Sequence, residues 1–280
     1  MNLKFTKMSG AGNDFIFLGP EQARLKGRLS ALAAQLCPRR TSVGADGLIL
    51  VEKIPAGIFM HYFNRDGSEA SFCGNGARCL VRYCAEKGIA DGVVHFSSRS
   101  GAHQGLVGPE GVTVSLDPPE LVRELDIKVE GAQHHVHLVR AGVPHAVIAC
   151  AETASVDVQG LGQLIRRHPA LGPDGANVDF VTTEAGPPFA LRTYERGVER
   201  ETLACGSGCV AAAAVLRRLG ITGERVQLRV ASGDVLTVDL EGRLAAREGT
   251  AAAEGPHALL TGPAVIVYEG EIDLKETEDV

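Results

Sequence analysis

The sequence predicts an α+β fold made of two similar halves, each rich in β-strands and each with one central helix. Three observations support this fold class. The chain contains an internal repeat, several segments alternate apolar and polar residues, and each copy of the repeat has one helical segment after a Cys-Gly-x-Gly sequence. The pattern lacks the regular alternation of strands and helices that would indicate a parallel α/β sheet.

The internal repeat is clearest around two cysteines. Cys73–Gly76 matches Cys205–Gly208, and the register is kept as far as Gly101 in the first copy and Gly233 in the second. Looser matches upstream set Gly44–Asp46 against Gly175–Asn177 and Gly12–Phe15 against Gly142–His145. We therefore expect two domains, residues 1–118 and 119–280, with the repeated core of the second at about 135–270.

Periodicity identifies elements within each half. Strict alternation predicts strands at Val112–Leu116 and Val235–Leu240. Apolar residues recur at helical spacing over Ala77–Ala85, and Gly88 follows as a natural helix end. The matching segment, Val210–Leu219, is apolar nearly all round, which indicates a helix buried against strands on most sides.

The composition limits the classes of function. A chain of 280 residues with 45% apolar residues can form packed domains, and no apolar run approaches the ~20 residues that cross a bilayer. The net charge of −6 disfavours nucleic-acid binding, so we expect a small-molecule partner and no membrane contact. The N-terminus carries no export signal, so we expect a cytoplasmic protein whose seven cysteines are thiols.

Cys73 and Cys205 are the candidate catalytic residues. Each directly precedes a Gly-x-Gly that opens a helix, and a helix N-terminus binds anionic groups and lowers the pKa of a neighbouring thiol. If the two halves face each other, the two thiols flank one carbon atom, so that one removes a proton and the other returns it. This arrangement is typical of a racemase or epimerase with its active site in the cleft between two domains.

Other interpretations stay open at this level. The remaining cysteines fit core positions in apolar surroundings: Cys37, Cys79, Cys84, Cys150 and Cys209. The cysteine spacing disfavours a structural zinc, and the alternating His134, His135 and His137 indicate a solvated strand face more than a ligand set. Gly10–Gly12 is a weak signal for a dinucleotide-binding turn. A non-catalytic binder of small anions and a thiol redox protein are the alternatives from other classes.

Five segments together resemble diaminopimelate epimerase. They are Phe5–Phe15, Phe63–Glu69, Cys73–Cys79, Tyr194–Gly197 and Glu201–Gly208. The resemblance covers essentially the whole chain. It implies an isomerase that needs no pyridoxal phosphate or other cofactor and no metal, and that interconverts LL- and meso-diaminopimelate for lysine and peptidoglycan synthesis. It also implies two pseudo-symmetric domains, each a mixed strand barrel around a central helix, and a cytoplasmic homodimer.

The resemblance further implies roles for individual residues. Cys73 and Cys205 match the acid/base pair of the family, and His145 and Glu195 match groups that tune the two thiols. The residues that match substrate contacts are Asn13, Asn64, Gly74, Asn75, Asn177, Glu195, Arg196, Gly206 and Ser207. Judged from the residues alone, the asparagines Asn13 and Asn177 fit turn positions equally well.

Two positions depart from the family pattern. Val143 stands where many members carry Asn, and Gly47 stands where some carry Gln. The nearest alternative is therefore a related two-thiol enzyme acting on proline, hydroxyproline or histidine. Diaminopimelate remains the expected substrate because its charged distal end needs polar partners, and Glu195 and Arg196 offer an acid and a guanidinium.

Overall fold

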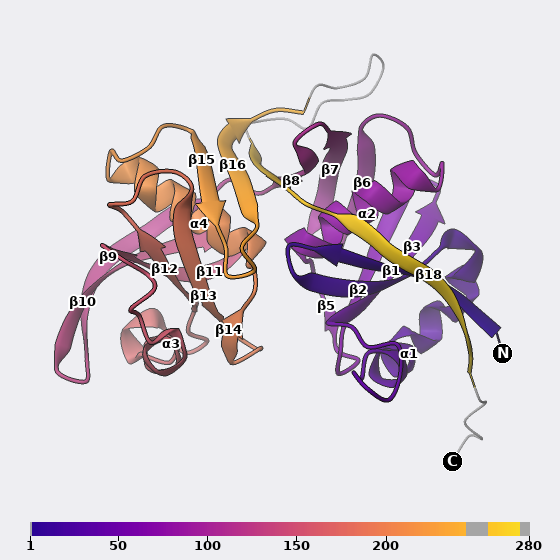
Figure 1. Ribbon diagram of the computed structural model, residues 1–280, viewed down its shortest axis with the longest axis horizontal. Coiled ribbons are helices and arrows are strands. Elements are labelled where there is room, and N and C mark those ends of the chain that lie inside the picture. Colours follow the sequence, from indigo (N-terminus) through magenta and orange to yellow (C-terminus); the bar gives the residue numbers. More distant parts are fainter. Residues whose placement is uncertain (1, 245–256, 275–280) are drawn as a thin grey trace. The chain divides into compact units, whose positions relative to one another are not determined.

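The chain divides into two compact units (Figure 1). A computed structural model describes residues 2–244 and 257–274. The first unit is Met1–Val107 with Ala264–Val280, and the second is Gly108–Pro263. These bounds differ from the expected domains 1–118 and 119–280, because residues 111–116 pair with a strand of the second unit and residues 265–273 pair with a strand of the first. Residues 245–256 and 275–280 of the expected second domain lie outside the described residues.

The first unit is a mostly antiparallel sheet with one helix packed in its middle. Its elements are β1 (Asn2–Gly10), β2 (Asn13–Leu18), η1 (Pro20–Arg28), α1 (Leu29–Leu36), β3 (Gly47–Ile54), β4 (Gly57–Asn64), β5 (Glu69–Ala70), α2 (Gly74–Glu86), β6 (Val94–Ser98), β7 (Gly101–Gly108) and β18 (Val265–Asp273). The strand order is β18-β1-β2-β3-β4-β6-β7, with the short β5 also on β4. Only the pairs β2–β3 and β4–β6 in this order are parallel.

The second unit repeats this plan. Its elements are β8 (Gly111–Leu116), β9 (Glu120–Val129), β10 (Ala132–Ala141), β11 (Val143–Cys150), α3 (Val158–Arg166), η2 (Pro169–Leu171), β12 (Asn177–Thr182), β13 (Phe189–Glu195), β14 (Arg200–Thr202), α4 (Gly206–Arg218), β15 (Arg225–Arg229), β16 (Val235–Gly242) and β17 (His257–Gly262). The order is β9-β10-β11-β12-β13-β15-β16-β17-β8, with β14 on β13 and parallel pairs at β11–β12 and β13–β15. The predicted α+β fold of two similar halves is therefore confirmed.

Each unit surrounds one central helix with strands. The helix α2 contacts β1, β2, β4, β6 and β18, and α4 contacts β10, β11, β12, β13, β15, β16 and β17. The small side chains of Ala211–Ala213 are fully buried, which lets the strands approach α4 closely. The nearly all-round apolar character of α4 thus follows from its position.

Both central helices end on the same motif. Gly88 and Gly220 follow the helix caps with φ of 61° and 72°, a left-handed conformation that glycine adopts without strain. The next residue closes the motif in each case: Ile89 N–H donates to the carbonyl of Cys84, and Ile221 N–H donates to the carbonyl of Leu216. The repeat seen in the sequence is therefore a repeat of backbone geometry.

Each expected domain has one strand that belongs to the other unit. The strand β8, in the expected first domain, pairs with β17, and β18, in the expected second domain, pairs with β1 (Figure 1, yellow beside indigo). This pairing is the reason that the compact units do not coincide with the two halves of the sequence.

Two readings of local sequence are wrong. Gly10–Gly12 forms the turn of the β1–β2 hairpin, where Ala11 and Gly12 both have positive φ, and not a dinucleotide-binding turn. His137 is buried in the sheet rather than part of a solvated face, although His135 beside it is exposed. Among residues 2–244 and 257–274, no helix has the length and apolar character needed to cross a membrane.

Candidate active site

Cys73 and Cys205 cap the two central helices. The backbone of each cysteine is extended, with φ/ψ of −147°/115° at Cys73 and −121°/111° at Cys205, and the helix begins at the next residue. Gly76 N–H donates to Cys73 Sγ at 3.5 Å, and Gly208 N–H donates to Cys205 Sγ at 3.4 Å. Each sulfur atom therefore takes the place of the oxygen acceptor that usually caps a helix.

The third residue after the thiol is glycine in both copies, where the first helical turn lies close to neighbouring side chains. A Cβ atom at Gly76 would lie 2.8 Å from Ile49 Cδ1. A Cβ atom at Gly208 would lie 2.5 Å from Asp179 Oδ1 and 3.2 Å from Thr193 Oγ1. The same backbone thus packs on an apolar side chain in one unit and on a buried carboxylate in the other.

A chain of polar contacts leads from Cys205 into the second unit. Cys205 Sγ lies 3.5 Å from Ser207 Oγ, which lies 3.0 Å from His145 Nε2. His145 Nδ1 lies 2.7 Å from Asp179 Oδ2, and both of these side chains are fully buried. Thr193 Oγ1 donates to the other oxygen of Asp179 at 2.7 Å.

These contacts select one tautomer of His145. The carboxylate of Asp179 accepts, so Nδ1 carries the proton and donates it. His145 Nε2 faces the Ser207 hydroxyl and, at 3.4 Å, the Asn177 amide nitrogen, both of which can donate. The imidazole is therefore a neutral acceptor on the side that faces Ser207.

The Cys205 thiol is protonated in this environment. Burial raises its pKa well above the ordinary value, and the negative charges of Glu195 and Asp179 raise it further. Hydrogen bonds from Ser207 and from Gly208 N–H act in the opposite direction without outweighing burial. The expectation that a helix end lowers the pKa of both thiols is wrong for Cys205, where burial and two carboxylates raise the pKa.

Polar contacts also lie near the start of α2, the helix that Cys73 caps. Arg78 is fully buried and donates to Asn75 Oδ1 at 2.7 Å and to the carbonyl of Gly74 at 3.5 Å. Asn75 Nδ2 donates in turn to Asn13 Oδ1 at 2.5 Å, and Asn13 Nδ2 donates to Asp46 Oδ2 at 3.1 Å. The first unit thus has a buried guanidinium and a row of amides at this helix, and Ile49 stands at the position where the second unit has Asp179.

The remaining predicted site residues lie at the ends of the strands. Asn64 ends β4 and donates from Nδ2 to Ser68 Oγ at 3.0 Å. Asn177 begins β12, is buried, and accepts from Arg196 N–H at 2.8 Å. Glu195 ends β13, and its charge acts on the Cys205 thiol. The structure therefore gathers His145, Asn177, Ser207 and Cys205 in the second unit, and Asn13, Asn75 and Cys73 in the first.

The sequence patterns do not single out three residues of this arrangement: Arg78, Asp179 and Thr193. A signal for Asp179 was present in the sequence, since an acid inside an otherwise apolar strand must have a buried partner. Gly47, noted as a departure, has a steric cause, because a Cβ atom there would lie 2.6 Å from Tyr62 Cε2.

The other cysteines carry no such surroundings. Cys37, Cys79, Cys84 and Cys209 are fully buried, and burial raises the pKa of the Cys37, Cys79 and Cys84 thiols to about 12. Cys150 is only half-buried, and burial raises its pKa as well. These thiols fit the structural role expected of them.

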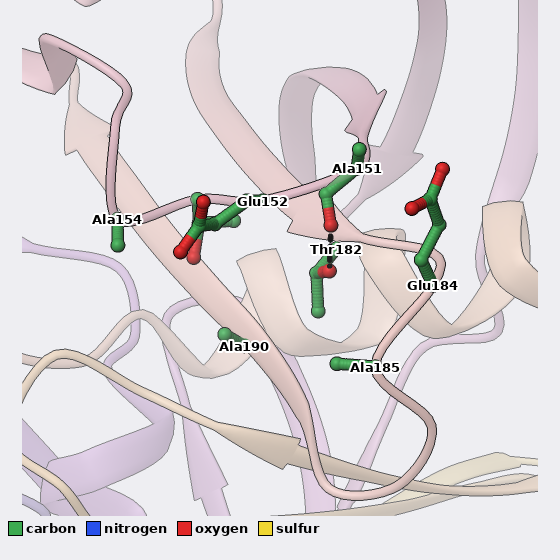
Figure 2. Close-up of a pocket in the computed structure, with 8 residues that line it drawn as sticks. Ala151, Glu152, Ala154, Thr182, Glu184, Ala185 and Ala190 are labelled. Atoms are coloured by element: carbon green, nitrogen blue, oxygen red, sulfur yellow. Dashed lines mark hydrogen bonds between the residues drawn. The ribbon is translucent and has the colours of Figure 1, made fainter.

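A surface depression of about 420 Å³ also lies in the second unit, away from the thiol (Figure 2). It is lined by Ala151–Ala154, Thr182 and Glu184, which follow or end β11 and β12. His145 and Asn177 lie near the opposite ends of the same two strands. The depression is therefore separate from the polar chain at Cys205.

Comparison with known proteins identifies the family. The family model for diaminopimelate epimerase matches residues 5–122 and again 137–251. Diaminopimelate epimerase of Aquifex aeolicus is 36% identical over 283 residues, covering 96% of this chain and 98% of the relative. That of Gemmatimonas aurantiaca is 38% identical over 280 residues, covering 96% and 99%. The chain belongs to the diaminopimelate epimerase family.

Solved structures show that other enzymes share the fold. A hydroxyproline epimerase from Agrobacterium vitis, bound to trans-4-hydroxy-L-proline, aligns with a TM-score of 0.72 at 17% identity, covering 99% of this chain and 94% of that one. A probable proline racemase from Agrobacterium radiobacter aligns with a TM-score of 0.71 at 18% identity. At these identities the likeness concerns the fold alone, so within the diaminopimelate epimerase family the substrate must be argued from the site.

Proposed function

We propose that this protein epimerises LL-diaminopimelate to meso-diaminopimelate by a two-thiol acid/base mechanism, without pyridoxal phosphate or a metal. The observation that carries the proposal is the pair of thiol-capped helices, one in each unit, in a chain of the diaminopimelate epimerase family. In this reaction one thiolate removes the α-proton of an amino-acid centre and a thiol on the other face of the carbon supplies a new one. The mechanism requires both Cys73 and Cys205 to reach the same carbon.

The helix ends supply the stabilisation that this proton transfer needs. Loss of the α-proton places extra negative charge on the substrate carboxylate, and the first N–H groups of a helix have no acceptor within the helix. We assign this role to the N-terminal residues of α2 and α4: Gly74, Asn75, Gly206 and Ser207. Their contribution is preorganised because the thiol caps already fix the first turn of each helix.

The proposed mechanism needs one thiol and one thiolate at the start of the reaction. Cys205 carries its proton at rest, so it serves as the acid in the direction in which Cys73 is the base. The reverse direction needs a Cys205 thiolate. In that direction Cys205 gives its proton to Ser207 Oγ while Ser207 gives its own proton to His145 Nε2, and Asp179 stabilises the imidazolium that forms.

The distal end of diaminopimelate fits the remaining polar residues. Arg196 offers a guanidinium that can bind a carboxylate through two hydrogen bonds, and Glu195 offers an acid for an ammonium group. We propose that Asn13, Asn64 and Asn177 complete this set through their amides. Proline and hydroxyproline would leave the distal charges without partners, which favours diaminopimelate over them.

Exchange of the α-proton tests the proposal. LL-diaminopimelate is incubated with the enzyme in deuterated water, beside L-proline, trans-4-hydroxy-L-proline and L-histidine as competitors for the assignment. We expect deuterium to enter the meso product, unlabelled LL substrate to remain early in the reaction, and full activity after dialysis against EDTA. Faster turnover of any competitor would overturn the substrate assignment, and no exchange with any amino acid would favour a non-catalytic binder.

We also propose that the enzyme works as a cytoplasmic homodimer in lysine and peptidoglycan precursor synthesis. An apolar surface on β18 supports the dimer, since Val265, Val267 and Tyr268 are exposed there. Analytical ultracentrifugation tests it. A Tyr268→Glu variant should shift the mass toward the monomer, whereas a monomeric wild type would contradict the proposal.

A further inference from the structure

Two imidazoles and a carboxylate meet on one face of the β9–β10 hairpin in the second unit, apart from the polar chain at Cys205. Glu124 on β9 is paired with His137 on β10, and Asp126 is paired with His135 two residues along. One ligand atom from each of Glu124, His135 and His137 lies within 4.8 Å of the other two. Alternate residues of adjacent strands share a face, so this cluster follows from the strand register.

His137 is the residue that needs an explanation. Its side chain is only 4% exposed, and Nδ1 has no hydrogen-bond partner among the described residues. Glu124 Oε1 lies 3.5 Å from Nδ1. A buried ring nitrogen that lacks a hydrogen-bond partner and faces a carboxylate can bind a cation through its lone pair.

His135 is held in the complementary orientation. Its Nδ1 donates to Asp126 Oδ1 at 2.9 Å, which leaves Nε2 as an acceptor, and Nε2 lies 3.9 Å from Glu124 Oε2. A histidine that ligates a metal usually donates its other ring N–H to a carboxylate in this way, because the contact fixes the tautomer and the ring. Asp126 is thus placed to orient His135 toward the same point that His137 Nδ1 faces.

We propose that Glu124, His135 and His137 bind a divalent transition-metal ion, with Asp126 orienting His135. Two imidazole nitrogens and one carboxylate oxygen suit Zn²⁺ better than Mg²⁺ or Ca²⁺, which prefer oxygen ligands. Three protein ligands leave a coordination position for water. The bound ion would join β10 to β9.

Arg218 competes for the same carboxylate. Its Nε donates to Glu124 Oε1 at 2.5 Å from the last turn of α4, and its side chain is 55% exposed. The guanidinium therefore satisfies Glu124 when no metal is bound, and its exposure lets it move into solvent when a cation arrives. Removal of Arg218 should strengthen metal binding, whereas removal of any ligand should weaken it.

Equilibrium dialysis against Zn²⁺ with elemental analysis tests the site. The full-length protein is first treated with iodoacetamide so that accessible thiols do not bind the metal. We expect His135→Ala and Glu124→Gln each to raise the Kd for one Zn²⁺ by at least about tenfold, Asp126→Asn to raise it about 10- to 100-fold, and Arg218→Gln to lower it. These positions are exposed, so the variants should fold, and His134→Ala on the opposite face of the same strand is the matched control.

The results that support the metal site differ from those that would overturn it. Loss of one Zn²⁺ in His135→Ala and Glu124→Gln, with His134→Ala unchanged, supports the site, as does an anomalous difference peak between β9 and β10 in Zn²⁺-soaked crystals. Equal Zn²⁺ binding by wild type, His135→Ala and Glu124→Gln would overturn the proposal. So would an equal loss in His134→Ala and His135→Ala, since that result means binding by any surface histidine. Neither result bears on the proposed epimerase activity, which uses other residues.

Discussion

The caps of α2 and α4 share one backbone and differ in charge. Each begins with an extended cysteine whose sulfur accepts from the N–H three residues later, and each helix ends on the same glycine motif. On α2, the buried guanidinium of Arg78 donates to Asn75, which donates in turn to Asn13. Beside Cys205 lie the buried carboxylate of Asp179 and a neutral imidazole. The repeat has therefore kept geometry and changed the electrostatics.

The difference matches what an acid/base pair requires. Two equivalent thiols in equivalent surroundings would titrate together, so no state with one base and one acid would be favoured. Burial and the negative charges of Glu195 and Asp179 raise the pKa of Cys205, which holds this thiol in the protonated form. The asymmetry thus gives the resting enzyme a defined acid.

The largest expected effect comes from removing either thiol. Cys73→Ser and Cys205→Ser should each lower kcat for epimerisation by about 10²- to 10⁴-fold, because a serine hydroxyl is a far weaker acid than a thiol. Both reaction directions should be measured for both variants. A variant that kept most of its activity would show that one base serves both faces, and the comparison of the two caps would lose its mechanistic meaning.

Asp179→Asn should have the next largest effect. We expect kcat to fall about tenfold or more in the direction that needs a Cys205 thiolate, because the imidazole proton is no longer fixed on Nδ1. Asp179 raises the pKa of Cys205, so its removal should lower that pKa. Activity that depends on protonated Cys205 is lost as pH rises through this pKa, and the variant should lose it at lower pH than wild type.

Thr193→Val is the control for this variant. It removes the contact of Thr193 with Asp179 but leaves the pair of Asp179 and His145 in place, so the pH profile should move much less. Equal shifts in both variants would indicate a general loss of packing rather than the charge of Asp179.

Thiol alkylation compares the caps without mutation. Iodoacetamide reacts with the thiolate, and Cys205 is both buried and protonated, whereas Cys73 is half-buried. At neutral pH we expect Cys73 to be modified at least about tenfold faster than Cys205, as followed by peptide mass spectrometry. Faster modification of Cys205 would mean that its surroundings do not suppress the thiolate.

The sequence predicts the local parts of this arrangement well and the long-range parts poorly. Cys73, Cys205 and the glycines after them are recognisable because a helix cap is formed within four consecutive residues. The pairing of His145 with Asp179 is not, since these residues lie 34 positions apart and only the register of β11 and β12 brings them together. The burial of Arg78 is not recognisable either, because the helical spacing of apolar residues leaves it outside the apolar stripe, yet its side chain is fully buried.

The strands that pair with the other unit show the same limit: local sequence does not predict long-range pairing. The alternation of apolar and polar residues can identify a strand, as it does for Val112–Leu116, but it does not show which strand pairs with it. The pairing of β18 with β1 joins the two ends of the chain, and nothing in the residues of β18 distinguishes it from a pairing within its own half. The expected domain boundary near residue 118 differs from the observed division for this reason.

The smallest expected effect concerns the glycine beneath each thiol, and it tests the two caps at one equivalent atom. In Gly76→Ala the new methyl group meets Ile49 Cδ1 and Met60 Cε, the flexible ends of two side chains, which can move aside. In Gly208→Ala it meets Asp179 Oδ1 at 2.5 Å, and Asp179 is held by His145 and Thr193. We expect Gly208→Ala to lower the free energy of unfolding by about 1–3 kcal/mol and Gly76→Ala by less than about 1 kcal/mol, since alanine also favours the helix. Urea denaturation of both variants measures the difference, with Gly27→Ala, where nothing lies within 4 Å of the new Cβ atom, as the control.

Gly208→Ala should also displace Asp179 and reproduce part of the pH shift of Asp179→Asn, so the two changes combined should cost less than their sum. If Gly76→Ala proves as costly as Gly208→Ala, the two caps are equally tight and the buried carboxylate does not set them apart.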